Sequence, residues 1–193
     1  MSAAHHQPDA LAPPAALPRI PGWRDRVRAV LARRRGVQVG DRVALGRGVR
    51  FALGPGARVT LGPGAVIGDR CRFQVAADGE VLIGAGTVLG ERCVISARRR
   101  VAVGARCLLA DEVVLVDAGP RYDDVERPLR EQGIVTSPIV VGDGARIGPA
   151  AALLPGATLP AGAVLGARAV LTRPSPPPSP PPARRARAAR APR

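Results

Sequence analysis

Residues 141–171 decide the fold, and they read VGDGARIGPAAALLPGATLPAGAVLGARAVL. Aliphatic residues return at every sixth position of this stretch: Val141, Ile147, Leu153, Leu159, Leu165 and Leu171. An alanine stands four residues after each of the first five. The pattern is aliphatic, Gly, any, any, small, any, and it predicts one short strand and one bend in every six residues.

The same period extends back to residue 39. Its aliphatic or Phe positions form six triplets: Val39, Leu45, Phe51; Leu61, Ile67, Phe73; Ile83, Leu89, Ile95; Val103, Leu109, Leu115; Val141, Ile147, Leu153; Leu159, Leu165, Leu171. Three strands per turn predict a triangular coil with these side chains inside, and stacked coils bury a column that no single coil buries alone. Glycine follows ten of the eighteen positions, and we attribute it to bend conformations that a Cβ would strain.

Residues that interrupt the period always enter after the third member of a triplet. Four enter after Phe51, four after Phe73, two after Ile95 and twenty after Leu115. All insertions are therefore expected to leave the coil at one corner. The longest, the loop at 117–138, carries many charged residues, and long excursions from compact scaffolds are usually functional.

The stretches 116–148 (VDAGPRYDDVERPLREQGIVTSPIVVGDGARIG) and 153–173 (LLPGATLPAGAVLGARAVLTR) carry a family resemblance. Over about 37–173 the sequence resembles the hexapeptide-repeat acyltransferases, in particular the sugar and other O-acetyltransferases similar to maltose and galactoside acetyltransferases. The resemblance implies an all-β fold, a left-handed parallel β-helix of about six triangular coils. The handedness follows from the resemblance alone.

The flanks differ from the repeat. Residues 1–21 are expected to be a disordered head, and 22–36 a helix that caps the open first coil and ends at Gly36. Its helical face would carry Trp23, Val27, Val30 and Leu31. A basic amphipathic helix lying on an anionic membrane is the alternative. Residues 174–193 (PSPPPSPPPARRARAARAPR) are predicted to be a disordered tail rich in Pro and Arg.

The formal net charge is +14, which raises the question of nucleic-acid binding. Most of the excess lies in the flanks, and every basic residue is arginine, which is typical of a GC-rich coding bias. We therefore expect no nucleic-acid partner. The sequence has no apolar run long enough for a membrane span, and residues 1–23 do not show the basic and then apolar pattern of a signal peptide, so we expect neither a membrane span nor secretion. The unpaired Cys71, Cys93 and Cys107 occupy the small position of the repeat and fit a cytoplasmic protein without a metal site.

In the family that the sequence resembles, a histidine in the long loop is the general base for acyl transfer from acyl-CoA to a hydroxyl. That histidine aligns with Pro120, and residues 37–173 contain no histidine. Asp117 is the candidate for a substitute base. The predicted acceptor-binding residues of the loop are listed here: Arg121, Tyr122, Asp123, Arg127 and Arg130.

The resemblance also implies where acyl-CoA binds, with acetyl-CoA as the expected co-substrate. The matching positions are Gly142, Gly148, Ala150, Gly166, Ala167 and Arg173. Many members carry an aromatic residue where this chain has Arg146, which changes that part of the pocket. The family builds its sites between subunits, so a homotrimer is expected.

These observations predict an acyl-CoA-dependent O-acyltransferase that acts on a hydroxyl of a sugar or small molecule. Two alternatives stay open. The first is a non-catalytic homologue that binds CoA or serves as a scaffold, because the loop histidine is missing. The second is a binder of polyanions or nucleic acid that acts through the arginine-rich tail.

Overall fold

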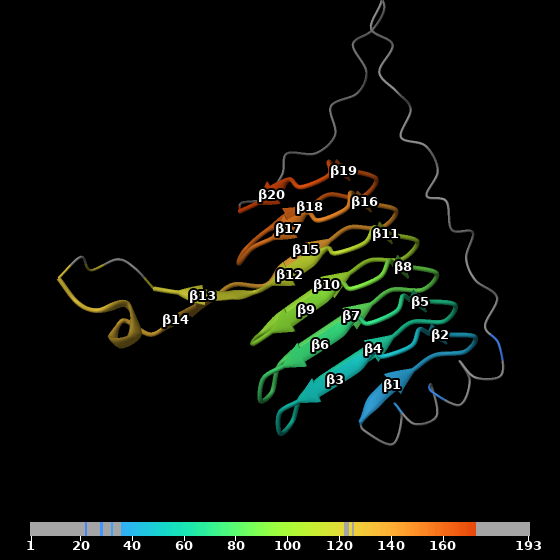
Figure 1. The fold of residues 1–193 in the computed structure, drawn as a ribbon, viewed down its shortest axis with the longest axis horizontal. Helices are drawn as coiled ribbons and strands as arrows, with labels where there is room; N and C mark the ends of the chain where they lie inside the picture. Colours follow the sequence, from blue (N-terminus) through green and yellow to red (C-terminus); the bar gives the residue numbers. More distant parts are fainter. Residues whose placement is uncertain are drawn as a thin grey trace, which may run out of the picture.

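The computed structural model describes Gly22, Arg28, Ala32 and residues 36–121, 124 and 126–172. The chain winds through three six-stranded parallel sheets, which form the three faces of one prism (Figure 1). Each coil gives one strand to each face, so the predicted all-β solenoid of about six coils is confirmed.

We name the faces A, B and C in the order in which each coil visits them. Face A contains β1 (Val37–Val39), β4 (Arg58–Leu61), β7 (Glu80–Ile83), β10 (Arg100–Val103), β15 (Ile139–Val141) and β18 (Thr158–Leu159). Face B contains β2 (Ala44–Leu45), β5 (Val66–Ile67), β8 (Val88–Leu89), β11 (Leu108–Leu109), β16 (Arg146–Ile147) and β19 (Val164–Leu165). Face C contains β3 (Arg50–Leu53), β6 (Arg72–Val75), β9 (Val94–Ala97), β12 (Val114–Val116), β17 (Ala152–Leu153) and β20 (Val170–Leu171). The corners are called AB, BC and CA after the faces they join.

The inward positions of the repeat make up the core. Of the eighteen, Val39, Phe51, Leu165 and Leu171 are half-buried and belong to the first and last coils, and the others are 3% exposed or less. The rings of Phe51 and Phe73 stack with centroids 4.9 Å apart. Each fully buried side chain of this kind contributes roughly 1.5–3 kcal/mol, so a column that is aliphatic except for these two Phe residues holds the coils together.

The reason we gave for the repeat glycines is wrong. The ten glycines that follow inward residues do not have positive φ. They are needed because the next coil passes directly over them. A Cβ on Gly46 would lie 2.5 Å from the carbonyl carbon of Gly68, and one on Gly148 would lie 2.5 Å from Ala167 N. Gly166 has nothing within 4 Å of that position, since it belongs to the last coil that the structure describes.

The left-handed backbone conformation falls two residues after these glycines, at the second residue of the corner turn. Several of these residues are glycine, and eight are not: Arg42, Arg70, Asp78, Arg92, Arg106, Glu112, Ala150 and Arg168, with φ between 53° and 60°. A left-handed conformation costs a residue with a Cβ roughly 1–2 kcal/mol. The coil geometry imposes this conformation whatever residue the sequence supplies.

Part of the predicted capping helix is described. Arg28 and Ala32 have helical backbone, and Ala32 is 5% exposed and belongs to the core. Arg28 Nη1 donates a hydrogen bond of 2.9 Å to the carbonyl of Leu45 on β2, the edge strand of face B. These contacts place the segment against the first coil. The remaining positions of the helix, other than Gly22 and Gly36, lie outside the described residues, as do the head and the tail from 173 onward. Over the part of the chain that is described, no helix is long and apolar enough to cross a bilayer.

Candidate active site

The long loop leaves the prism at corner CA, between the fourth and fifth coils. It forms an antiparallel hairpin of β13 (Ala118–Pro120) and β14 (Ile134–Thr136), followed outward by a 3-10 helix, η1 (Leu129–Glu131). We call residues 118–136 the arm. Figure 1 shows the arm projecting well away from the faces of the prism. The prediction that insertions share one corner is confirmed by the shorter connections between face C and face A.

The tip of the arm is organised by Gln132, which our sequence analysis did not single out. Its Nε2 donates to the carbonyls of Asp124 (2.6 Å) and Arg127 (2.7 Å), and its Oε1 accepts from Asp124 N (3.1 Å). Arg127 Nη2 donates to the carbonyl of Glu131 (3.3 Å). A glutamine between Glu131 and Gly133 has no sequence signal for this role, because its partners come from the turn that it closes.

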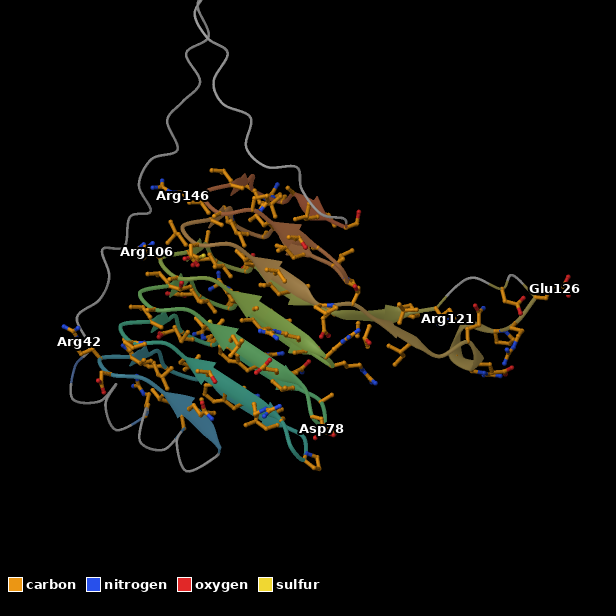
Figure 2. All side chains as sticks on the ribbon, turned by 180° about the vertical axis from the view of Figure 1, so that it is seen from behind. Arg42, Asp78, Arg106, Arg121, Glu126 and Arg146 are labelled. Atoms are coloured by element: carbon orange, nitrogen blue, oxygen red, sulfur yellow. The ribbon has the colours of Figure 1, made fainter. Side chains whose placement is uncertain are left out.

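Three predicted acceptor-binding residues of the arm are described. Arg121, Arg127 and Arg130 are exposed, and Arg130 Nε lies 3.7 Å from Glu131 Oε1. Figure 2 shows Arg121 partway along the arm and Glu126 at its tip. Tyr122 and Asp123 lie outside the described residues.

Asp117 stands at the root of the arm, where its side chain is completely buried. Oδ1 accepts a hydrogen bond from Arg98 N, and Oδ2 accepts from Arg99 N and Arg100 N, each at 2.7 Å. Its carbonyl accepts from Ser137 N at 2.9 Å. Both carboxylate oxygens are thus used to hold the CA corner of the coil below, and the backbone joins the two ends of the loop. This geometry favours a structural role, and the role of Asp117 as a base stays a prediction.

Pro120, the position aligned with the family histidine, is an exposed residue of β13 and pairs in register with Ile134. It has no N–H and no titratable group, so it supplies no proton acceptor. The two histidines of the chain, His5 and His6, lie outside the described residues. Among the described residues, the titratable side chain nearest to Pro120 in sequence is Arg121, and the next nearest is Asp117.

The predicted CoA-binding residues fall at two other corners. Gly142 lies at corner AB of the fifth coil, whereas Gly148 and Ala150 lie at corner BC of that coil, directly beneath Gly166 and Ala167 of the sixth. Arg168 N donates to the carbonyl of Pro149 across the same pair of turns (2.8 Å). The structure thus brings four of the predicted residues together and leaves Gly142 apart. Arg173 lies outside the described residues.

Within one chain, the arm and these corners are separated by the faces of the prism. Figure 2 shows Arg106 and Arg146 at the edge of the prism opposite the arm. Arg146 is the outward residue of β16 on face B and is exposed. Corners CA and BC lie at opposite ends of face C.

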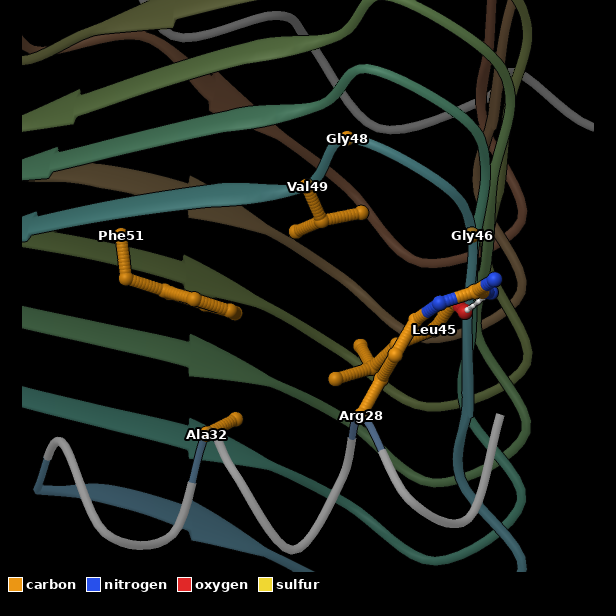
Figure 3. Close-up of a pocket in the computed structure, with 7 residues that line it drawn as sticks. All are labelled: Arg28, Ala32, Leu45, Gly46, Gly48, Val49 and Phe51. Carbon is orange, nitrogen blue, oxygen red and sulfur yellow. Dashed lines mark hydrogen bonds between the residues drawn. The ribbon is translucent and has the colours of Figure 1, made fainter. Parts of the chain in front are cut away.

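A cavity of about 160 Å³ lies between the first coil and the helical residues Arg28 and Ala32 (Figure 3). Its lining is Arg28, Ala32, Leu45, Gly46, Gly48, Val49 and Phe51. The arm leaves the prism three coils further along, and the predicted CoA corner lies beyond the arm, so the cavity is not part of the candidate site.

The three cysteines occupy the small position next to face C or face B and are buried and free of disulfides. The Sγ atoms of Cys71 and Cys107 donate to the carbonyls of Gly90 and Gly142, each at 3.1 Å. Burial raises the pKa of the Cys107 thiol. No group of three or more His, Cys, Asp or Glu side chains in the described residues is arranged to hold a metal ion.

Comparison with models of known protein families and with curated protein sequences finds no match. Solved structures of similar fold include the N-acyltransferase AntD from Bacillus cereus. A variant of AntD in complex with dTDP and coenzyme A has a TM-score of 0.63 and 13% identity, over 76% of this chain and 80% of that chain. AntD in complex with dTDP and 3-hydroxybutyryl-CoA has a TM-score of 0.58 and 12% identity, over 75% and 78%. At these identities the similarity shows the β-solenoid fold.

Proposed function

We propose that the chain is an acyl-CoA-dependent acyltransferase whose active site forms between subunits of a homotrimer. The observation that carries the proposal is the division of the predicted site within one chain. The arm leaves at corner CA, and the CoA positions that lie together are at corner BC. A neighbouring copy would bring the arm of one subunit to the BC corner of the next. The complexes of AntD with coenzyme A and with an acyl-CoA support the choice of co-substrate, and we propose acetyl-CoA for this chain.

The outer surface of the last two coils supports an assembly. Val140 on face A, Val164 on face B and Val170 on face C are 42%, 54% and 59% exposed. The arm adds Ile134 and Val135, which are 50% and 40% exposed. An isolated two-stranded hairpin is marginally stable in water. Contact with a second copy would cover these side chains and stabilise the arm.

The acceptor supplies the nucleophile that attacks the thioester carbonyl, and its proton must leave. For a hydroxyl of a sugar or small molecule, a positioned base typically accelerates this step roughly 10²–10⁴-fold. The loop carries no histidine, so we expect slow transfer to hydroxyls, sustained by the proximity of the two substrates.

An amine acceptor is the second candidate, favoured by the same missing histidine and by the occupied carboxylate of Asp117. A neutral amine has a free lone pair and attacks without prior removal of a proton. AntD is an N-acyltransferase, and its complexes contain dTDP or an amino-sugar nucleotide. An amino sugar is therefore the amine to test first.

Binding of the co-substrate is tested by thermal shift with acetyl-CoA and free CoA, together with light scattering at micromolar protein concentration. We expect a trimer that both ligands stabilise. Three single variants, Val140→Arg, Val164→Arg and Val170→Arg, place a charge on each face in turn. At least one should yield a folded monomer that no longer binds CoA. A wild-type monomer, or a monomeric variant that keeps full CoA affinity, would contradict the inter-subunit site.

The acceptor class is tested by transfer assays with matched sugars that carry a hydroxyl or an amine at the same position. Faster transfer to the amine supports the second candidate. Pro120→His should raise the rate with hydroxyl acceptors and leave the amine rate nearly unchanged. Binding of CoA without transfer to any acceptor would instead favour the non-catalytic homologue.

A further inference from the structure

Two arginines stand directly opposite each other on face C near the first coil. Arg50 on β3 and Arg72 on β6 are partners in the parallel register, and both are exposed. Figure 1 shows the two strands side by side at the lower end of the prism. Neighbouring strands lie about 4.8 Å apart, and like charges directly opposite each other are destabilising. Among the strand registers of the described residues, this is the one pair of like charge.

On face A, the corresponding column of outward strand positions avoids such like-charge pairs. There the column reads Arg58, Glu80, Arg100, so that charge alternates from coil to coil. Arg100 Nε lies 3.5 Å from Glu80 Oε2. On face C the column continues from Arg72 to Val94, so neither arginine has an acid as its partner in the described strand register.

Corner BC adds two more arginines to this edge of the prism. Arg70 lies above Arg47, since Arg70 N donates to the carbonyl of Arg47 at 2.7 Å, and both side chains are exposed. We call Arg47, Arg50, Arg70 and Arg72 the arginine quartet. In the described part of the chain, none of the four guanidinium groups has an ion-pair partner.

The acid within these two turns is Asp69, whose Oδ1 accepts the N–H of Arg47 at 2.8 Å. It therefore serves the backbone of the corner. The next acid along the corner, Glu91, lies 3.3 Å from Arg92 and is engaged there. The quartet with Asp69 keeps a net charge of +3.

We propose that the arginine quartet binds a small ligand that carries a diphosphate group. Guanidinium groups recognise phosphate oxygens through paired, charge-assisted hydrogen bonds. A second row of guanidinium groups one strand spacing above the first suits two adjacent phosphates, whereas a single phosphate or carboxylate would leave half of the quartet unpaired. The proposal does not rest on the proposed function, because the quartet belongs to the first two coils and the predicted CoA positions to the last two.

The test is isothermal titration of the full-length protein with inorganic pyrophosphate, with inorganic phosphate for comparison. Pyrophosphate should bind at least tenfold more tightly than phosphate. The double variant R50Q/R72Q should weaken pyrophosphate binding at least tenfold. The control R58Q/R106Q removes the same charge from two exposed arginines elsewhere and should change the affinity less than twofold.

Thermal melting shows whether the double variant folds, and we expect its melting temperature to equal or exceed that of the wild type because a like-charge pair is removed. Its acyl-transfer rate at saturating acetyl-CoA should equal that of the wild type, which separates this site from the acyltransferase site. Equal pyrophosphate affinity of R50Q/R72Q and wild type would overturn the proposal. Equal affinity for phosphate and pyrophosphate would also overturn it. The same holds if the quartet is needed for binding single-stranded DNA but not for binding pyrophosphate.

Discussion

Replacing Asp117 by Asn distinguishes a structural carboxylate from a catalytic one. The aspartate accepts three backbone N–H groups of residues 98–100, each at 2.7 Å, inside a fully buried corner. Asparagine keeps one oxygen and so retains at most two of these bonds, as a neutral acceptor. Its NH2 group then faces the remaining N–H donor. Hydrogen bonds to charged groups are worth about 1.5–3 kcal/mol each, and an unsatisfied buried donor costs about 1–3 kcal/mol.

Part of that loss is offset, because burying a carboxylate itself costs several kcal/mol. We therefore expect Asp117→Asn to lower the free energy of unfolding by about 2–4 kcal/mol. The assay is urea unfolding at neutral pH, compared at one protein concentration because assembly adds a concentration-dependent term. A lower midpoint at an unchanged slope identifies a change in stability.

Asp111→Asn is the matched control. Asp111 is exposed and its Oδ1 accepts one backbone N–H, from Glu91 at 2.7 Å, so its replacement should cost less than about 1 kcal/mol. If Asp117→Asn unfolds like the wild type but loses acyl transfer, the carboxylate acts as the base and the structural reading is refuted.

Four further predictions concern the wall of the prism. Gly46→Ala should cost about 1–3 kcal/mol in urea unfolding, since its Cβ meets the next coil, whereas Gly166→Ala at the open end should stay within about 0.5 kcal/mol of the wild type. Arg106→Gly, at φ 53°, should raise the melting temperature by relieving left-handed strain, and a lower value would show that the side chain contributes more than the backbone costs. Ile67→Arg should abolish soluble expression because Ile67 is 1% exposed, while Arg70→Gln should express and melt like the wild type; equal tolerance at both would contradict the register. Because burial raises the pKa of the Cys107 thiol, the folded state keeps a proton that the unfolded state loses above about pH 8.5, so unfolding free energy should fall as pH rises past that value. Cys107→Ala should flatten this decline, and an unchanged slope would rule out Cys107 as its source.

The repeat predicted the fold because its period sets both the inward side chains and the coil length. Ile67 and Leu109 are buried where the six-residue spacing places them. The physical role of the glycines was missed, since close approach between coils becomes visible only when residue 46 is known to lie under residue 68. The same holds for Asp117, whose three donors precede it by 17 to 19 residues, about one coil.

The repeat predicts the corner at which each candidate CoA-binding residue lies, but it does not predict the arrangement of the arm. The triplets alone place Gly148 and Gly166 at one corner and Gly142 at another, which the structure confirms. The hairpin of the arm and the closure of its tip by Gln132 depend on contacts within the loop, where no periodicity operates. Arg50 and Arg72 are 22 residues apart, so their opposition also follows only from the register of the coils.

Because all insertions leave at corner CA, this corner is where the chain tolerates changes in length. Faces A and B follow one another, as do B and C, through turns of fixed length, so adding a residue there would shift every inward side chain of the coil. At corner CA the connection ranges from the short turn at Leu154–Ala157 to the whole arm, while the strands above and below stay in register. The length of the loop at this corner can therefore vary, or be changed by engineering, without disturbing the coils. A foreign hairpin grafted in place of residues 154–157 would present a second arm directly above the first.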